Sequence, residues 1–370
     1  MKKQKLKAAC MIILACAAAL FLWTTMLALH VRPRNRHPRR ESLRFDFFQR
    51  LLEEREKAFN LSPQQVQDEY AERPQMWVLV GSTARSGTSL IGELMSKTKP
   101  SIYFFEPELF VRASSGNLVM KENGMPFLEA VGECRFDEAF IEWLHTRSKG
   151  NVVRHKMTGR CRTSTQCFTM DTLTEACRSE HLRIMKVIRF RIRWMRELLS
   201  SSKFDFKLVH LIRDPRASLR SMYSHHLTKL QPDYYCPLIE DDLNQIKELE
   251  SEFPGQVLKL KYESFCLDPE GQSSKLWRFL SGNQTASLPP EWTAFLEKHT
   301  HKKSNHIDPV YGTVRDTRDE YLAWRWEIHE DLLADVEKYC ASAIHNLGYN
   351  LFGTIDVARN KSVPLFLEDL

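Results

Sequence analysis

The sequence lacks the patterns that usually mark a metal centre. It contains 9 cysteines, but no two of them stand at Cys-x-x-Cys spacing, and structural zinc sites usually need such pairs. No other cluster of metal-binding side chains is evident, so we expect no metal. The sequence also has no internal repeat and no low-complexity tract, and 43% of its residues are hydrophobic. This composition is typical of a folded globular chain.

A strong charge of one sign is also missing. The formal net charge is +6 over 370 residues, and much of it lies near the N-terminus. So modest a balance gives little support for nucleic-acid binding, and it fits a groove for anionic ligands equally well. We therefore expect no nucleic-acid partner.

The N-terminal end differs in composition from the rest of the chain. An uncharged run at 8–29 follows several lysines and precedes several arginines, and about 20 apolar residues span a bilayer as a helix. A cleaved signal peptide is the alternative, but the run is long for one and no clear cleavage site precedes the arginines. The expected organisation is a cytoplasmic tail (1–7), a retained transmembrane signal-anchor (8–29), a stem (30–74), a luminal domain (75–355) and a C-terminal tail (356–370).

Glycosylation triplets support a luminal orientation for the main domain. They begin at Asn60, Asn283 and Asn360, all after the anchor, although Pro63 makes the first a poor acceptor. Basic residues flank the anchor on both sides, so the positive-inside rule says little about its orientation. In an oxidising lumen, the cysteines beyond the anchor are expected to form roughly two or three disulfides, with at least one cysteine left over.

Apolar runs of strand length alternate with helical patterns from residue 76 onward. This alternation predicts an α/β fold, in which helices flank a mostly parallel, P-loop-like sheet and ligands bind beyond the carboxyl ends of the strands. Residues 111–180 are harder to read, and we expect polar loops and insertions there. Strands are expected at 76–80, 102–105, 182–190, 207–212 and 256–261, and a long helix from about 319 to 347, stopped by Gly348.

The stretch after the first strand has the character of an anion-binding loop. Small residues at 81–89, Gly-Ser-Thr-Ala-Arg-Ser-Gly-Thr-Ser, lead from a strand into a helix, and the free N–H groups at a helix start bind phosphate. The stretch does not fit the nucleoside-triphosphate pattern G-x-x-x-x-G-K-[ST], because Thr88 stands where the lysine belongs. The cation, Arg85, comes earlier. An ordinary turn with an exposed arginine is the alternative.

A second candidate phosphate site follows the strand at 207–212. Arg213 stands at the carboxyl end of that strand, and Ser221 lies about two turns into the next helix. A guanidinium and a hydroxyl can both donate hydrogen bonds to a phosphate. The alternative is an Arg–Asp pair beside a surface helix. Two phosphate sites without a P-loop lysine fit a nucleotide that carries phosphates at both its 5′ and 3′ positions.

These two stretches together resemble the phosphate-binding motifs of sulfotransferases. The matching pieces are R-S-G-T-S at 85–89 and L-I-R-D-P-R-A-x-x-x-S at 211–221. Arg85, where cytosolic enzymes have lysine, resembles the membrane-bound galactose/N-acetylglucosamine/N-acetylgalactosamine 6-O-sulfotransferases. Weaker matches are F-F-E-P at 104–107, M-K-V-I-R at 185–189, K-Y-E-S-F at 261–265 and Y-G-T-V-R at 311–315.

The resemblance implies a sulfotransferase fold and a carbohydrate sulfotransferase activity. The enzyme would move a sulfuryl group from the co-substrate 3′-phosphoadenylyl sulfate to a hydroxyl, expected to be the 6-hydroxyl, of a glycan or glycosaminoglycan. It would be a type II protein of the Golgi membrane with a luminal catalytic domain. A homodimer is left open. The residues implied to bind the donor are Arg85, Ser86, Gly87, Thr88, Ser89, Arg213, Ser221 and Arg315, and those implied in catalysis are Arg85, Glu106 and Lys186.

Glu106 is the candidate general base for the acceptor hydroxyl. We expect the aromatic side chains just before it, at 103–105, to desolvate its carboxyl group and raise its pKa. The alternative is a helix-capping or ion-pair role beside Pro107. Lys186 and Arg189 end another strand and are expected to contact the sulfuryl group or an anionic acceptor, or else to lie on the surface.

Three further side chains are weighed against a structural role. His210 lies within a buried strand and is expected to be a core residue rather than a base. Trp324 and Trp326 could stack on a sugar or on adenine, but core packing is the commoner use of tryptophan.

Two other functions compete with sulfuryl transfer. One is a kinase with an aberrant P-loop, which the missing lysine disfavours. The other is a catalytically inactive, membrane-anchored glycan-binding protein, which the presence of Arg85, Glu106, Arg213 and Ser221 disfavours.

Overall fold

The computed structural model describes residues 73–112, 119–146, 152–154, 168–224, 231–300 and 317–367. The chain divides into the units Met1–Gln49 and Arg50–Leu370, and all described residues belong to the second. The expected anchor, nearly all of the stem, and Arg315 lie outside the described residues. None of the helices in the described ranges is both long enough and apolar enough to span a membrane.

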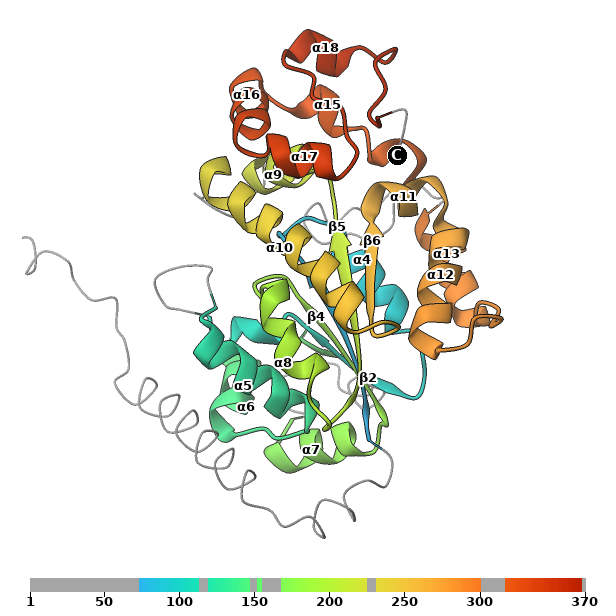
Figure 1. The fold of residues 1–370 in the computed structure, drawn as a ribbon. Coiled ribbons are helices and arrows are strands. Elements are labelled where there is room, and N and C mark those ends of the chain that lie inside the picture. Colours follow the sequence, from blue (N-terminus) through green and yellow to red (C-terminus); the bar gives the residue numbers. More distant parts are fainter. Residues whose placement is uncertain are drawn as a thin grey trace, which may run out of the picture. The chain divides into compact units, whose positions relative to one another are not determined.

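A single sheet organises the described part of the chain (Figure 1). Its six described strands lie in the order β3-β2-β4-β1-β5-β6. All neighbouring pairs are parallel except β2 and β3, which confirms the predicted parallel α/β architecture. The strands are β1 (Gln75–Gly81), β2 (Ser101–Phe105), β3 (Val153–Arg154), β4 (Leu182–Val187), β5 (Asp205–Ile212) and β6 (Val257–Lys261).

The helices cover both the sheet and its carboxyl edge. The α-helices among the described residues are α4 (Thr88–Met95), α5 (Lys121–Gly132), α6 (Glu138–Thr146), α7 (Met170–Arg178), α8 (Arg196–Leu199), α9 (Pro215–Ser224), α10 (Pro232–Glu252), α11 (Tyr262–Leu267), α12 (Pro269–Ser281), α13 (Pro290–Thr300), α14 (Thr317–Glu320), α15 (Trp324–Glu327), α16 (Glu330–Tyr339), α17 (Ala341–Asn346) and α18 (Ile355–Arg359). Two 3₁₀ turns, η1 (Pro107–Leu109) and η3 (Ile192–Met195), follow β2 and β4.

Two hydrophobic clusters hold these layers together. One face of β1, with Trp77 and Leu79, packs against α4 and against α11–α13. The second cluster joins the end of β5 to α9, α10 and α15–α17, and Figure 1 shows these C-terminal helices gathered around α9 and α10. Because both faces of the central strands are covered, their sequences are continuous apolar runs rather than alternating ones.

The expected long helix at 319–347 is wrong. The chain instead forms α14 to α17, because Ile328 adopts an extended conformation (ψ 141°) and is buried. Cys340 then separates α16 from α17 with φ −99° and ψ 10°. Gly348 does follow α17 in a left-handed conformation, with φ 76°.

Two further regions differ in detail from the sequence pattern. The strand expected at 182–190 ends at Val187, because the N–H of Ile188 donates to the Glu108 carboxylate instead of to a strand. The hard-to-read stretch 111–180, where polar loops and insertions are expected, contains α5, α6 and α7 in its described part.

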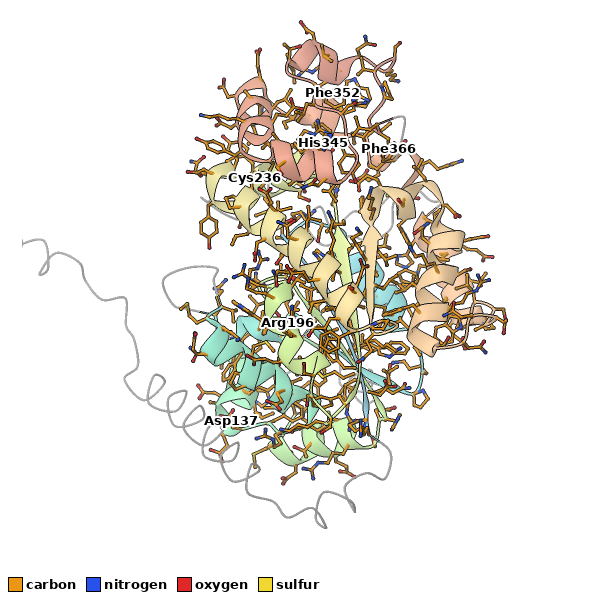
Figure 2. All side chains as sticks on the ribbon, in the orientation of Figure 1. Asp137, Arg196, Cys236, His345, Phe352 and Phe366 are labelled. Atoms are coloured by element: carbon orange, nitrogen blue, oxygen red, sulfur yellow. A yellow bond between two sulfur atoms is a disulfide. The ribbon has the colours of Figure 1, made fainter. Side chains whose placement is uncertain are left out.

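Disulfides are confirmed in the described residues. Cys134 pairs with Cys177, and Cys236 (labelled in Figure 2) pairs with Cys340, which ties α10 to the junction of α16 and α17. Cys266 is buried and unpaired. The remaining cysteines lie outside the described residues.

Candidate active site

The loop from Ser82 to Gly87, here called the phosphate loop, joins β1 to α4. Arg85 and Gly87 adopt left-handed conformations with φ of 64° and 92°. A Cβ atom on Gly87 would lie 2.3 Å from Cδ2 of Tyr262, so only glycine fits there. No side chain caps the start of α4. A helix start without a side-chain cap leaves N–H groups available, and such groups bind anions.

The structure brings the two phosphate motifs into direct contact. Nε of Arg85 donates a hydrogen bond to Oγ of Ser221 over 3.1 Å. Nη1 of Arg213 donates to the carbonyl of Arg85 over 2.9 Å. Pro215 begins α9, as its position in the sequence predicted. The parallel register of β1 and β5 aligns their carboxyl ends and explains this meeting.

Arg213 and Ser218 retain unused hydrogen-bond donors at the start of α9. The guanidinium of Arg213 stacks on Tyr262, with Cζ 4.5 Å from the ring centroid. Its Nε atom and Oγ of Ser218 are buried and have no hydrogen-bond partner among the described residues. Buried polar groups are nearly always satisfied, so this corner is suited to an anionic ligand.

The second arginine of the motif has a different role. Arg216 is fully buried and pairs with Asp214 and Glu337 at 2.9 and 2.6 Å. The N–H of Asp214 is held in turn by Glu263, at 2.9 Å. Arg216 therefore fixes the C-terminal helices to the motif, while Arg213 faces the phosphate loop. The sequence did not separate these two roles.

Glu106 lies at the carboxyl edge of β2, in a buried ion-pair cluster. Its carboxylate accepts hydrogen bonds from Nζ of Lys186 and, over 2.8 Å, from Nη1 of Arg189. Its N–H donates to the carbonyl of Lys186 over 2.8 Å. Lys186 is 2% exposed, and its Nζ lies 4.4 Å from the centroid of the Phe105 ring. A surface position for Lys186 is therefore excluded.

The expected rise in the pKa of Glu106 is wrong. Burial does push this pKa upward, but the charges and hydrogen bonds of Lys186 and Arg189 outweigh burial and lower the pKa to about 2. Glu106 is therefore an ionised carboxylate at neutral pH. Its neighbour Glu108 has the opposite shift, because burial outweighs the attraction of Arg189 and raises the pKa of Glu108 to about 7.

A buried polar network that sequence reasoning missed lies behind the phosphate loop. Oγ of Ser82 is 2.6 Å from Nε2 of His210. His210 is a core residue, as predicted, and burial, with Arg191 and Lys259 nearby, lowers its pKa to about 3. Nη2 of Arg191 donates to the carbonyl of Ser82 over 2.9 Å and lies 3.1 Å from the Asp242 carboxylate. The feature of the sequence that could have indicated this network is the alternation of arginines after β4, at 189, 191 and 193.

The remaining candidates do not join this site in the described structure. Trp324 is buried beside Arg216 and Phe352, in the core role that was favoured. Trp326 is 40% exposed and has Lys361 over its ring. Among the described residues, no group of three or more His, Cys, Asp or Glu side chains could hold a metal ion.

Comparison with known proteins assigns the class. The sulfotransferase domain family matches residues 75–348. The chain therefore belongs to this family, and it is a sulfotransferase.

The similar proteins narrow the class. The chain is 24% identical to human carbohydrate sulfotransferase 5, over 78% of this chain and 81% of that protein. It is 23% identical to mouse carbohydrate sulfotransferase 4, over 76% of this chain and 84% of that protein. The predicted resemblance to carbohydrate sulfotransferases is thereby confirmed. Among solved structures, the sulfotransferase domain of the Synechococcus PCC 7002 olefin synthase aligns with a TM-score of 0.39 at 16% identity, over 76% of this chain and 98% of that domain.

Proposed function

We propose that this enzyme transfers the sulfuryl group of 3′-phosphoadenylyl sulfate to a sugar hydroxyl, specifically the 6-hydroxyl, of a glycan or glycosaminoglycan. The observation that supports this most strongly is the hydrogen bond between Arg85 and Ser221. It joins two phosphate motifs at one edge of the sheet, as a donor with phosphates at both ends of its ribose needs. The names of the similar proteins support a carbohydrate acceptor.

The residues present fit such a donor. On the 5′ side, the uncapped start of α4 and the guanidinium of Arg85 offer donors to a phosphosulfate. On the 3′ side, Arg213 and Ser218 have buried donors without partners in the described residues, and Ser221 adds a hydroxyl. Ser86, Thr88 and Ser89 complete the 5′ side. Arg315, the other residue proposed for the 3′-phosphate, lies outside the described residues.

The chemical step depends on charge at two places. Arg85 and the N–H groups at 87–89 would neutralise the charge that develops on the leaving phosphate oxygen. Arg213 and Ser221 would hold the donor so that its sulfur faces the acceptor hydroxyl. The bond from sulfur to the acceptor oxygen forms while the bond from sulfur to the phosphate oxygen breaks, and the hydroxyl proton passes to Glu106.

The low pKa of Glu106 has a consequence for this proton transfer. An ionised carboxylate with a low pKa is always ready to accept a proton but is a weak base. The hydroxyl becomes acidic only as its oxygen bonds to sulfur, so Glu106 would take the proton late in the step. Lys186 and Arg189 orient the carboxylate for this transfer.

The proposed setting is the Golgi membrane. A tail (1–7), an anchor (8–29) and a stem (30–74) would hold the catalytic domain (75–355) in the lumen, with a short tail (356–370) behind it. The disulfides of the domain and the exposed sequons at Asn283 in the domain and Asn360 in the tail support an oxidising, glycosylating compartment. Protease treatment of intact microsomes tests this, because a luminal domain is digested only after detergent is added.

The activity is tested by transfer of radiolabelled sulfate from the donor to a panel of glycans. Chondroitin, keratan-type chains and N-acetylglucosamine-capped glycans form the panel, and the position of the product sulfate is then determined. Sulfation at a 6-hydroxyl supports the proposal in full. Binding of a glycan without transfer would instead indicate an inactive glycan-binding protein.

A further inference from the structure

Four arginines follow β4 within eight positions, and we call residues 189–196 the arginine segment. In the structure each of them meets a carboxylate, and Arg196 (labelled in Figure 2) begins α8 and pairs with carboxylates of α10. The pairs are Arg189 with Glu106 and Glu108, Arg191 with Asp242, Arg193 with Asp241, and Arg196 with Glu248 and Glu252.

Two of these arginines contact different parts of the candidate site. Arg189 holds Glu106, the proposed base for the acceptor. Arg191 donates to the carbonyl of Ser82, at the start of the phosphate loop. Only Phe190, which is fully buried, separates them. One short piece of backbone therefore contacts both the acceptor side and the donor side of the site.

Asp242 fixes this piece of backbone to α10. It is fully buried, and Oδ1 accepts the N–H of Ile192 over 3.0 Å. Its Oδ2 lies 3.1 Å from Nη2 of Arg191, the same nitrogen that bonds to Ser82. The helix that carries Asp242 is itself held by the Cys236–Cys340 disulfide. Movement of Arg191 would thus need a buried charge pair to break, which is costly.

We propose that Arg191, held by Asp242, is a positioning residue that ties the phosphate loop to α10 and keeps the loop in register with Glu106. We call the contacts of Arg191 with the Ser82 carbonyl and with Asp242 the tether. The expected effect of the tether on sulfuryl transfer rests on the proposed function, whereas the tether itself consists of contacts within the chain. A loop without the tether keeps its residues but loses the alignment of its N–H groups, so the predicted defect is in donor binding.

The chain offers matched controls one or two residues away. Arg193 pairs with Asp241 through Nε, over 2.9 Å, on the exposed side of the same segment. The comparison is therefore Arg191→Ala against Arg193→Ala, and Asp242→Asn against Asp241→Asn. A hydrogen bond to a charged group is worth about one order of magnitude or more in affinity. We expect the donor KM to rise about tenfold in Arg191→Ala and Asp242→Asn, with a smaller fall in kcat. The donor KM should stay unchanged in the controls.

A second readout does not depend on activity. Amide hydrogen exchange at residues 83–89 should accelerate in Arg191→Ala and Asp242→Asn, and not in Arg193→Ala or Asp241→Asn. Arg191→Lys should restore part of the protection, because lysine keeps the charge beside Asp242 but lacks the planar fork. If Arg191→Ala fails to fold, Asp242→Asn decides the matter, because its amide oxygen can still accept the N–H of Ile192 while the charge beside Arg191 is lost.

The outcomes separate the two proposals. Donor KM values and exchange rates at 83–89 that match the wild type in both Arg191→Ala and Asp242→Asn overturn the tether. A wild-type protein that transfers no sulfate overturns the proposed function. In that case, amide exchange at 83–89 that is faster in Asp242→Asn than in Asp241→Asn still supports the tether. Equal exchange in these two variants rejects it.

Discussion

Arg85 and Ser221 stand 136 positions apart in the sequence and share a hydrogen bond of 3.1 Å. Each belongs to a different strand-to-helix connection, and Arg213 reinforces the contact through the carbonyl of Arg85. The two phosphate motifs therefore form one surface rather than two separate sites. A ligand that contacts both needs an anionic group at each end, which is the property of the proposed donor.

Arg85→Ala should abolish nearly all transfer. The substitution removes both the charge beside the leaving oxygen and the bond to Ser221, so we expect kcat/KM to fall by at least about 100-fold. Arg196→Ala is a suitable control, since Arg196 is half-buried and pairs with Glu248 and Glu252 in the described structure. Turnover close to that of the wild type in Arg85→Ala would remove this residue from the mechanism.

Glu106→Gln should separate donor binding from turnover. The amide cannot accept the hydroxyl proton, so we expect kcat to fall by about 100-fold or more. Binding of 3′,5′-adenosine diphosphate, measured by calorimetry, should be retained. The exposed Glu248→Gln controls for the general effect of losing a carboxylate. If Glu106→Gln turns over normally, another group takes the proton.

Gly87→Ala should disturb the phosphate loop through contact with Tyr262. The added Cβ would meet this ring at 2.3 Å, in a backbone conformation with φ 92°. Gly255 offers a control, because its φ of 77° is similar and nothing lies within 4 Å of the added atom. Both substitutions carry a strain cost of about 1 kcal/mol. Only Gly87→Ala should also raise the donor KM, and an equal KM in the two variants would contradict this.

Glu108 should make stability fall between mildly acidic and mildly alkaline pH. Burial raises its pKa from the ordinary 4.5 to about 7, so the folded state keeps a proton that the unfolded chain has lost. The resulting stabilisation is fully present below 4.5 and is lost as the pH rises through about 7. Glu106, whose pKa is lowered, does not titrate in this range.

The unfolding temperature at pH 5 and pH 8 measures this effect. We expect the wild type to lose more stability over this interval than Glu108→Gln, whose amide does not titrate and can still accept the N–H of Ile188. Equal losses in the two proteins would show that Glu108 is not the titrating group.

The meeting of the two phosphate motifs followed from the sequence, whereas their role in donor binding stays a prediction. Arg85, Arg213 and Ser221 were assigned from local motifs, and the carboxyl ends of parallel strands meet at one edge. Their proximity therefore followed once β1 and β5 were recognised as strands.

The acceptor side depended on contacts that no local pattern contains. Glu106 pairs with Lys186, 80 positions away, and this pairing reversed the expected direction of its pKa shift. The Ser82–Arg191–Asp242 network likewise joins three separate segments. The C-terminal helix breaks at the buried, extended Ile328 and again at Cys340, which is bonded to Cys236 at a sequence separation of 104.

The most direct test of the account is transfer of radiolabelled sulfate from 3′-phosphoadenylyl sulfate to the glycan panel by the wild type, with Arg85→Ala and Glu106→Gln alongside. We predict a labelled glycan with the wild type and almost none with either variant. Absence of any labelled product with the folded wild type, or undiminished labelling with both variants, would contradict the account.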